Sequence, residues 1–182
     1  MADASYKLAS QIKGDVRFDR MSRLLYSTDA SMYQIEPLGV VLPKSKKDVK
    51  AVIAFANEEG ISIIPRGGGT GLAGGVVGPG LVMDMSKHMN KVLELNVDEK
   101  WVRVEPGVVL DELNAYLKPH GLQFAPDVST SSRATIGGMV ANNSAGAHSV
   151  IYGKTIDHVI ELDVLLADGS EAKLGELDEA DV

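Results

Sequence analysis

The chain has 182 residues, which is enough for one ordinary domain, or for two small lobes that share a flank, with a core that needs no cross-links. It has no cysteine, which excludes disulfides, thiolate catalysis, cysteine-bound zinc and iron–sulfur clusters held by this chain alone. The formal net charge is −7 and the 18 basic residues form no long run, so the basic surface expected of a nucleic-acid binder is missing.

The first predicted unit is a strand, a helix and a second strand. Residues 39–43, GVVLP, indicate a short buried strand, and residues 61–65, ISIIP, indicate another. Between them we expect a helix that begins after Ser45, which forms a capping-box pattern with Asp48, and ends at Gly60. Its apolar positions are Val49, Val52, Ile53 and Ala56. This β-α-β unit ends at a glycine-rich loop, at the carboxyl end of a strand, where α/β folds commonly hold ligands.

The second half of the chain predicts more strands and one more helix. Strands are expected at residues 81–85, 91–97 and 101–107. The helix has its apolar residues at Leu110, Leu113 and Leu117 and ends near Pro119 and Gly121. A weak boundary at residues 95–100 divides two α+β lobes that contribute polar, glycine-rich segments to one groove.

A hairpin is expected near the end of the chain. Asp168 and Gly169 lie between two apolar segments and predict a type I′ turn. The last eight residues, GELDEADV, are acidic and have no apolar pattern. Because an enzyme that ends shortly after a hairpin is unusual, we expect these residues to be part of a longer protein.

Residues 65–80, PRGGGTGLAGGVVGPG, form what we call the glycine loop, with eight of the chain's 19 glycines. Without Cβ atoms, successive backbone N–H groups can turn inward and approach an anion closely, while Arg66 and Thr70 add a charge and a hydroxyl donor. This pattern favours a diphosphate ligand. The alternative is a flexible linker, which the strands on either side make less favourable.

The glycine loop also contains a GxGxxG pattern, formed by Gly69, Gly71 and Gly74, with Glu94 at the distance expected in a Rossmann fold. That fingerprint must begin a helix, whereas the following GVVGPGLVM contains glycines and a proline that would break one. No GK[ST] follows, which excludes a Walker A loop. We therefore interpret the loop as a phosphate site outside either standard nucleotide fold.

Residues 126–153 form a second polar segment, rich in small residues. Thr135 is predicted to cap a short helix whose first turn contains Gly137 and Gly138, which would direct free N–H groups at an anion. Hydrogen-bonding side chains follow at Asn142, Asn143, Ser144 and His148. The alternative is a long surface loop with a capped helix. Because the chain contains both the glycine loop and this second segment, one extended ligand that spans the two lobes explains the pattern better than a surface loop does.

The histidines predict no metal site. His88, His120 and His158 are scattered and show no HxH or HxxxH spacing. His148 lies among small polar residues, where a hydrogen-bonding role is more common than proton transfer. We assign no catalytic residue in this chain.

Four segments, in order, resemble the FAD-binding domain of the vanillyl-alcohol oxidase and p-cresol methylhydroxylase type, the PCMH type. They are PRGGGTGLAGG at 65–75, VEPGVVLDEL at 104–113, ATIGGMVANNSAGAHSVIYGKT at 134–155 and LLADG at 165–169. Within this type they are similar to FAD-linked oxidases: glycolate oxidase flavin subunits, D-lactate dehydrogenases and D-2-hydroxyglutarate dehydrogenases. Residues 26–45 resemble the long members that are fused to a C-terminal iron–sulfur portion.

The resemblance implies an α+β domain of two lobes, residues 1–97 and 98–182, with FAD between them. The pyrophosphate would lie against Arg66, Gly67, Gly68, Gly69, Thr70, Gly71 and Leu72. The cofactor would be lined by Pro126, Ala134, Gly137 and Gly138, with Asn142, Ser144, Gly146 and His148 along the ribityl and flavin side, and Ile160 giving backbone contacts. The FAD is expected to be non-covalent, because the chain has no cysteine and its glycine loop has no histidine.

The resemblance also implies an activity that needs more than this chain. A D-2-hydroxy acid such as lactate, glycolate or 2-hydroxyglutarate would transfer a hydride to FAD, and the electrons would pass to a quinone or an iron–sulfur domain. A cap domain absent from these residues would bind the substrate, so we expect no turnover by the fragment alone. No apolar stretch reaches the roughly 20 residues that span a bilayer, so we expect a cytoplasmic protein, peripheral to the inner membrane in its longer form.

Two alternatives remain open. One is an enzyme of the UDP-N-acetylmuramate reductase type, which shares the fold and uses NADPH. The other is a non-catalytic flavin carrier, or a fragment that binds nothing on its own.

Overall fold

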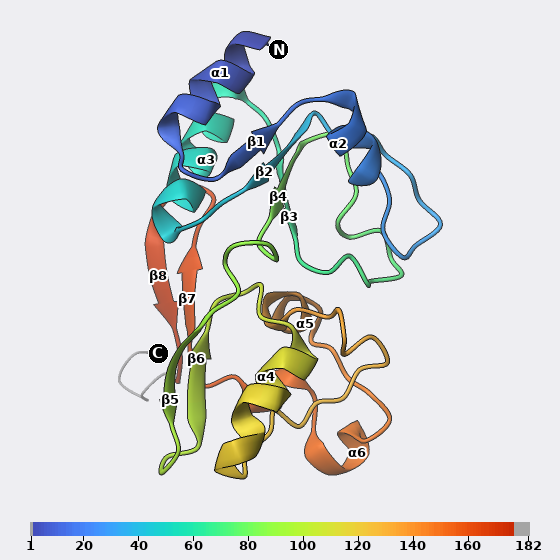
Figure 1. Ribbon diagram of the computed structural model, residues 1–182, viewed down its shortest axis with the longest axis vertical. Coiled ribbons are helices and arrows are strands. Elements are labelled where there is room, and N and C mark those ends of the chain that lie inside the picture. The colour runs from blue at the N-terminus through green and yellow to red at the C-terminus, as the bar shows by residue number, and fades with distance from the viewer. Residues whose placement is uncertain (1, 177–182) are drawn as a thin grey trace.

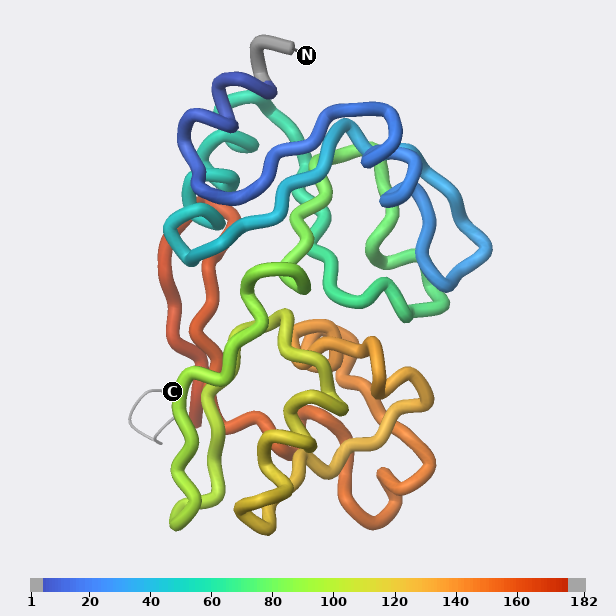
Figure 2. The backbone as a smooth tube through the Cα atoms, viewed as in Figure 1, coloured from blue at the N-terminus to red at the C-terminus, as the bar shows by residue number. Residues whose placement is uncertain are grey.

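The computed structural model describes residues 2–176, arranged as two lobes along the long axis of the molecule (Figures 1 and 2). The α-helices are α1 (Ala2–Gln11), α2 (Arg20–Leu25), α3 (Lys46–Glu59), α4 (Leu110–Leu117), α5 (Ile136–Asn142) and α6 (Ser149–Tyr152), with short 3-10 turns at Lys118–His120 and Thr155–His158. The strands are β1 (Asp15–Arg17), β2 (Gly39–Leu42), β3 (Ile63–Arg66), β4 (Leu81–Asp84), β5 (Val92–Asn96), β6 (Trp101–Val104), β7 (Leu162–Leu165) and β8 (Glu171–Leu174). Within this range, no helix is both long and apolar enough to cross a membrane.

The first lobe is a four-stranded sheet in the order β1-β2-β4-β3, covered by α1 and α3. The strands β2, β4 and β3 are parallel, and β1 is antiparallel at one edge. Every residue of β2 and β4 is buried, as expected for parallel strands covered on both faces. The β-α-β prediction is therefore confirmed, but β4 lies between the two predicted strands, so the crossover passes over a strand that comes later in the chain.

The helix α3 begins and ends where the sequence predicts. The hydroxyl of Ser45 accepts a hydrogen bond from the Asp48 N–H at 3.2 Å, and Gly60 ends the helix in the left-handed region at φ 65°. The capping-box prediction holds only for the serine, because the buried Asp48 carboxylate accepts from Lys44 N–H (2.9 Å) and Lys13 N–H (3.1 Å). It thereby connects the helix to the segment before β1.

The second lobe has its own core under the β5–β6 hairpin, between α4 and α5. Its buried residues are Val108, Leu110, Leu113, Leu117, Ala134, Ile136 and Met139. They include the three leucines predicted for the second amphipathic helix. Val92 and Leu95 of β5 pack against this core, and the predicted division at residues 97 and 98 falls in the turn of the hairpin.

The β7–β8 hairpin, red in Figure 1, extends from the second lobe to the first. Leu165 packs against the core of the first lobe, and Glu171 pairs with Lys46 and Lys50 of α3. At the other end, the guanidinium of Arg103 on β6 pairs with Asp163 of β7 and with Glu161, the residue before β7. The hairpin therefore contacts both lobes.

The turn of this hairpin differs from the predicted type I′ turn. Gly169 N–H donates to Leu166 O (2.9 Å) and Leu166 N–H donates to Ser170 O (2.9 Å), which closes a three-residue loop. Gly169 has a positive φ of 83°, whereas Asp168 does not, and a type I′ turn needs both. The hairpin prediction is confirmed and the turn type is wrong.

Candidate functional site

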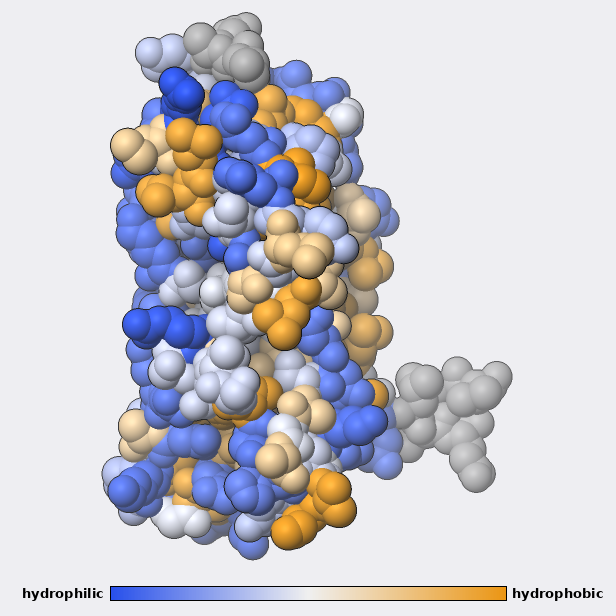
Figure 3. Space-filling view, turned by 90° about the vertical axis from the view of Figure 1, so that its right-hand side faces the viewer, coloured by the Kyte–Doolittle hydropathy of each residue, from blue (hydrophilic) through white to orange (hydrophobic). Residues whose placement is uncertain are grey.

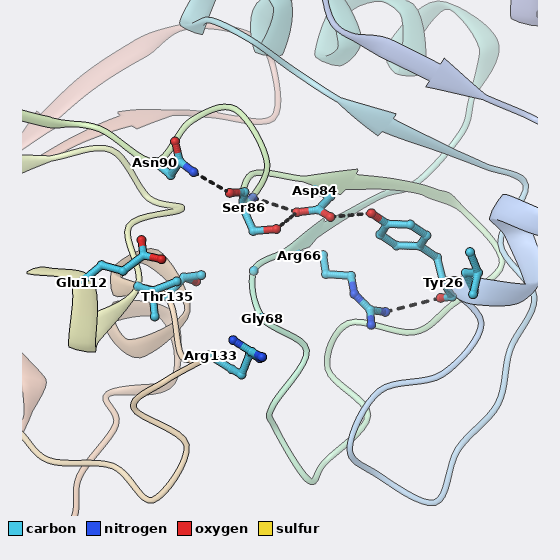
Figure 4. A pocket seen from close by; sticks show the side chains of 12 residues that line it. Tyr26, Arg66, Gly68, Asp84, Ser86, Asn90, Glu112, Arg133 and Thr135 are labelled. Atoms are coloured by element: carbon cyan, nitrogen blue, oxygen red, sulfur yellow. Dashed lines mark hydrogen bonds between the residues drawn. The ribbon is translucent and has the colours of Figure 1, made fainter.

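A cavity of about 380 Å³, the central cavity, lies between the two lobes (Figure 4). It is lined by Leu25, Tyr26, Arg66, Gly67, Gly68, Asp84, Ser86, Asn90, Val109, Glu112, Arg133 and Thr135. Arg66, Gly67 and Gly68 come from the glycine loop, and Arg133 and Thr135 come from the second polar segment. The structure thus brings the two predicted segments to one site.

The glycine loop meets the second polar segment at Gly67 and Gly68, which have no side chains. A Cβ atom on Gly67 would lie 2.1 Å from Oγ1 of Thr135, and one on Gly68 would lie 2.2 Å from the carbonyl oxygen of Arg133. Any other residue at either position would push the segments apart. These two glycines are therefore required by contacts within the protein.

The backbone N–H groups of the glycine loop are free to bind an anion. Among the described residues 2–176, none accepts a hydrogen bond from the N–H groups of residues 68–72. Five successive N–H groups without a protein acceptor form the kind of surface that binds a phosphate. No helix follows this loop before β4, in agreement with the rejection of the Rossmann pattern.

Gly71 lies within this free run. A Cβ atom on Gly71 would meet no atom of the described residues 2–176 within 4 Å, and its backbone is outside the left-handed region. Neither packing nor backbone conformation explains a glycine there. A ligand that approaches the backbone closely would explain it, so the loop fits a diphosphate group.

Arg66 is held at the base of the glycine loop. Its guanidinium donates to Thr28 O at 2.8 Å and, less closely, to Tyr26 O at 3.4 Å and Val76 O at 3.5 Å. It also lies over the Tyr26 ring, 5.2 Å from the centroid. The predicted positive charge is therefore present at the cavity, in a fixed position.

The central cavity is also lined by Tyr26, Asp84 and Ser86, which were not predicted from the sequence. The buried Asp84 carboxylate accepts from the Tyr26 hydroxyl at 2.6 Å and from the backbone and hydroxyl of Ser86, each at 2.7 Å. Burial, then the hydrogen bond to Asp84 and its charge, raise the pKa of Tyr26, so the phenol remains protonated. The position of Asp84 at the carboxyl end of a parallel strand was the available signal.

The N-terminus of α5 differs from the prediction in one respect. Thr135 caps the helix by accepting from Gly138 N–H at 3.4 Å, as predicted. Gly137 N–H, however, donates to Pro106 O at 2.9 Å. The first-turn N–H groups that were expected to be free are occupied, so that part of the prediction is wrong. Gly137 is needed for packing instead, because a Cβ there would lie 2.6 Å from the Pro106 side chain.

A second cavity, of about 260 Å³, is lined by Pro126 and His148 together with Asp127 and Tyr152. The Asp127 carboxylate accepts from the His148 backbone at 3.2 Å and lies 2.7 Å from its Nδ1. Desolvation raises the pKa of Asp127, but the hydrogen bonds from His148 outweigh it and hold that pKa below its ordinary value. Two of the predicted cofactor residues therefore lie in this cavity and not in the central one.

The remaining predicted residues are spread around these cavities. Ala134 is buried and its carbonyl accepts from Leu110 N–H, while Asn142 lies exposed at the end of α5. The carbonyl of Ser144 accepts from Thr155, and Gly146 packs against Asp127, whose carbonyl oxygen would lie 1.6 Å from a Cβ. Leu72 is 79 % exposed and Ile160 is 69 % exposed, so neither contributes a packed wall.

Among the described residues, the ionisable side chains form no metal site. Over residues 2–176, no three His, Asp or Glu side chains are arranged to hold a metal ion. His88 pairs with Asp15 at 3.1 Å, a contact that the sequence spacing did not indicate.

Most of the chain matches a known protein family. Residues 37–175 match the family described as FAD binding domain. This range includes the glycine loop and the second polar segment, and it begins after the loop of residues 26–36.

Curated relatives are similar over most of this chain. A D-2-hydroxyglutarate dehydrogenase from Pantoea ananatis is 48 % identical over 164 residues, which are 88 % of this chain and 16 % of that protein. A glycolate oxidase subunit from Bacillus subtilis is 36 % identical over 91 % of this chain and 36 % of its own length. The chain therefore spans about one sixth to one third of these relatives.

Solved structures share the fold at lower identity. An alkyldihydroxyacetonephosphate synthase superposes with a TM-score of 0.86 at 23 % identity, over 98 % of this chain and 35 % of that one. A p-cresol methylhydroxylase superposes with a TM-score of 0.82 at 20 % identity, over 94 % of this chain and 35 % of that one. The predicted PCMH-type α+β fold is thus confirmed, and the chain belongs to the FAD binding domain family.

Proposed function

We propose that this chain is the FAD-binding portion of a longer flavin-dependent dehydrogenase. The main supporting observation is the run of free backbone N–H groups at residues 68–72, beside the central cavity between the lobes. The diphosphate would lie against this run, with Arg66 supplying a nearby positive charge. The α5 N-terminus is a poorer diphosphate site because its donors are already bonded.

The cofactor would extend from the first lobe to the second lobe, which includes the β5–β6 hairpin. Thr70, Gly71 and Leu72 would continue the diphosphate contacts. In the second lobe, the proposed contacts are Pro126, Ala134, Gly137, Gly138, Asn142, Ser144, Gly146, His148 and Ile160. The FAD would be bound without a covalent bond, because no cysteine exists and the glycine loop has no histidine.

The reaction proposed for the longer protein is oxidation of a D-2-hydroxy acid. FAD supplies the redox step by accepting a hydride from the substrate α-carbon, and this chain's residues bind and orient the cofactor. The relatives at 48 % and 36 % identity act on hydroxy acids according to their names, which favours this substrate class. A quinone or an iron–sulfur portion as acceptor, and a cytoplasmic location at the inner membrane, belong to the same proposal.

The test is titration of the purified chain with FAD, ADP, FMN and NADPH, followed by flavin fluorescence and equilibrium dialysis. We expect saturable FAD binding, competition by ADP because it contains the same diphosphate, and weaker binding of FMN and NADPH. Acid denaturation should release the flavin from the protein band. A folded chain that binds no FAD, or one that prefers NADPH, contradicts the proposal.

A further inference from the structure

The loop of residues 26–36, which connects α2 to β2, lies beside the glycine loop and outside the range matched to the family. It has a defined shape because it closes on itself: Ile35 N–H donates to Ser27 O at 2.9 Å, and Thr28 pairs with Gln34. Ser27 is fully buried at its base. The 26–36 loop is thus a formed element of the first lobe, on the right-hand side in Figure 1.

Three kinds of contact join the 26–36 loop to the glycine loop. Ala30 N–H donates to Gly69 O at 3.0 Å. The guanidinium of Arg66 donates to the carbonyl of Thr28. The ring of Tyr33 packs against Gly74, where a Cβ would lie 2.6 Å from its Cδ2.

Two of these contacts, those to Gly69 and Gly74, lie where the backbone of the glycine loop is left-handed. Gly69 and Gly74 are its two left-handed residues, with φ values of 65° and 73°. Between them lies Gly71, within the free N–H run. The 26–36 loop therefore contacts the glycine loop on either side of Gly71 in the sequence.

We infer that the 26–36 loop is a positioning element for the cofactor. Its contacts with Gly69 and Gly74 fix the shape of the glycine loop. The inference rests on the proposed FAD binding. Tyr33 is the clearest positioning residue, because its side chain is 53 % exposed and contributes little to the core while its ring borders Gly74. Its neighbour Met32 is 90 % exposed and serves as a matched control. Figure 3 shows the side of the molecule on which the 26–36 loop lies, where hydrophobic and hydrophilic residues are intermingled on the surface.

The experiment compares Tyr33→Ala, Tyr33→Phe and Met32→Ala in the full chain. For each variant, the FAD dissociation constant, the circular dichroism of the bound flavin and the unfolding midpoint without FAD are measured. We expect Tyr33→Ala to weaken FAD binding by about tenfold, which is the size of effect expected from losing one ring contact. Tyr33→Phe restores the ring and should bind within about twofold of the wild type, as should Met32→Ala. The unfolding midpoint should be the same for all.

The outcomes separate this inference from the proposed function. If wild-type protein binds FAD and Tyr33→Ala binds it equally well, positioning by the 26–36 loop is wrong and FAD binding stands. If Tyr33→Ala lowers the midpoint along with the affinity, its role is general stability and the inference is overturned. If the wild type binds no FAD, the proposed function fails and this inference fails with it.

Discussion

The glycines of the glycine loop differ in what requires them. Gly67 and Gly68 are needed for contact with Thr135 and Arg133, and Gly69 is left-handed. Gly71 has open space and an unstrained backbone. Glycine density alone predicted a phosphate site, but it did not distinguish Gly67 and Gly68, which admit a neighbouring segment, from Gly71, which faces open space.

This difference gives a prediction for Gly71→Ala. The methyl group would occupy the surface proposed for the diphosphate, and crowding of this kind should raise the FAD dissociation constant by about tenfold or more. The free energy of unfolding without FAD should change by only about 0.5 kcal/mol. Gly68→Ala is the contrasting variant, since its Cβ would clash with Arg133 O and lower stability without any ligand. If Gly71→Ala binds FAD normally, the diphosphate lies elsewhere.

Asp15 gives a prediction about acid stability. Hydrogen bonds from Lys87 and then His88 lower the pKa of Asp15 to about 2. Because the folded pKa is below its usual value of about 3.9, the pair stabilises the fold above about pH 4, and this contribution is lost as the pH falls towards about 2. Urea unfolding should show Asp15→Asn less stable than wild type near neutral pH, with the difference shrinking in acid. A difference that is constant with pH would contradict the ion pair.

At the scale of elements, the sequence predicted α3 and α4 because their apolar residues are strongly periodic. The buried leucines of α4 and the apolar face of α3 repeat at helical spacing. Gly60 ends α3 as predicted, and α4 ends at Leu117, followed by the 3-10 turn that Gly121 ends. No signal in the sequence predicted α1, β1 and α2. The last two have three and six residues, too few for periodicity to show.

The turn between β5 and β6 offers a test of local strain. Lys100 has a φ of 59°, in the left-handed region that disfavours side chains with a Cβ. Lys100→Gly should raise the free energy of unfolding by about 0.5 to 1 kcal/mol, measured by urea denaturation. Lys100→Ala removes the same charge but keeps the strain, so it should give no such gain. Equal gains from both variants would assign the effect to charge.

At the scale of the whole molecule, the sequence predicted that two distant segments share one site, and the structure confirms that they meet. Residues 66–68 line the same cavity between the lobes as Arg133 and Thr135. The sequence could not predict that Tyr26 lies at this site, because Tyr26 approaches Asp84 only through tertiary folding. The pair of Asp127 and His148 also joins residues with no spacing signal between them.

The central claim is that the diphosphate of FAD binds the free N–H groups of residues 68–72. Backbone amide NMR of the 182-residue chain during titration with FAD, and separately with ADP, tests it most directly. We predict that both ligands shift the amide signals of these five residues most strongly and in a saturable manner. Saturable binding that leaves these signals unchanged would contradict the claim.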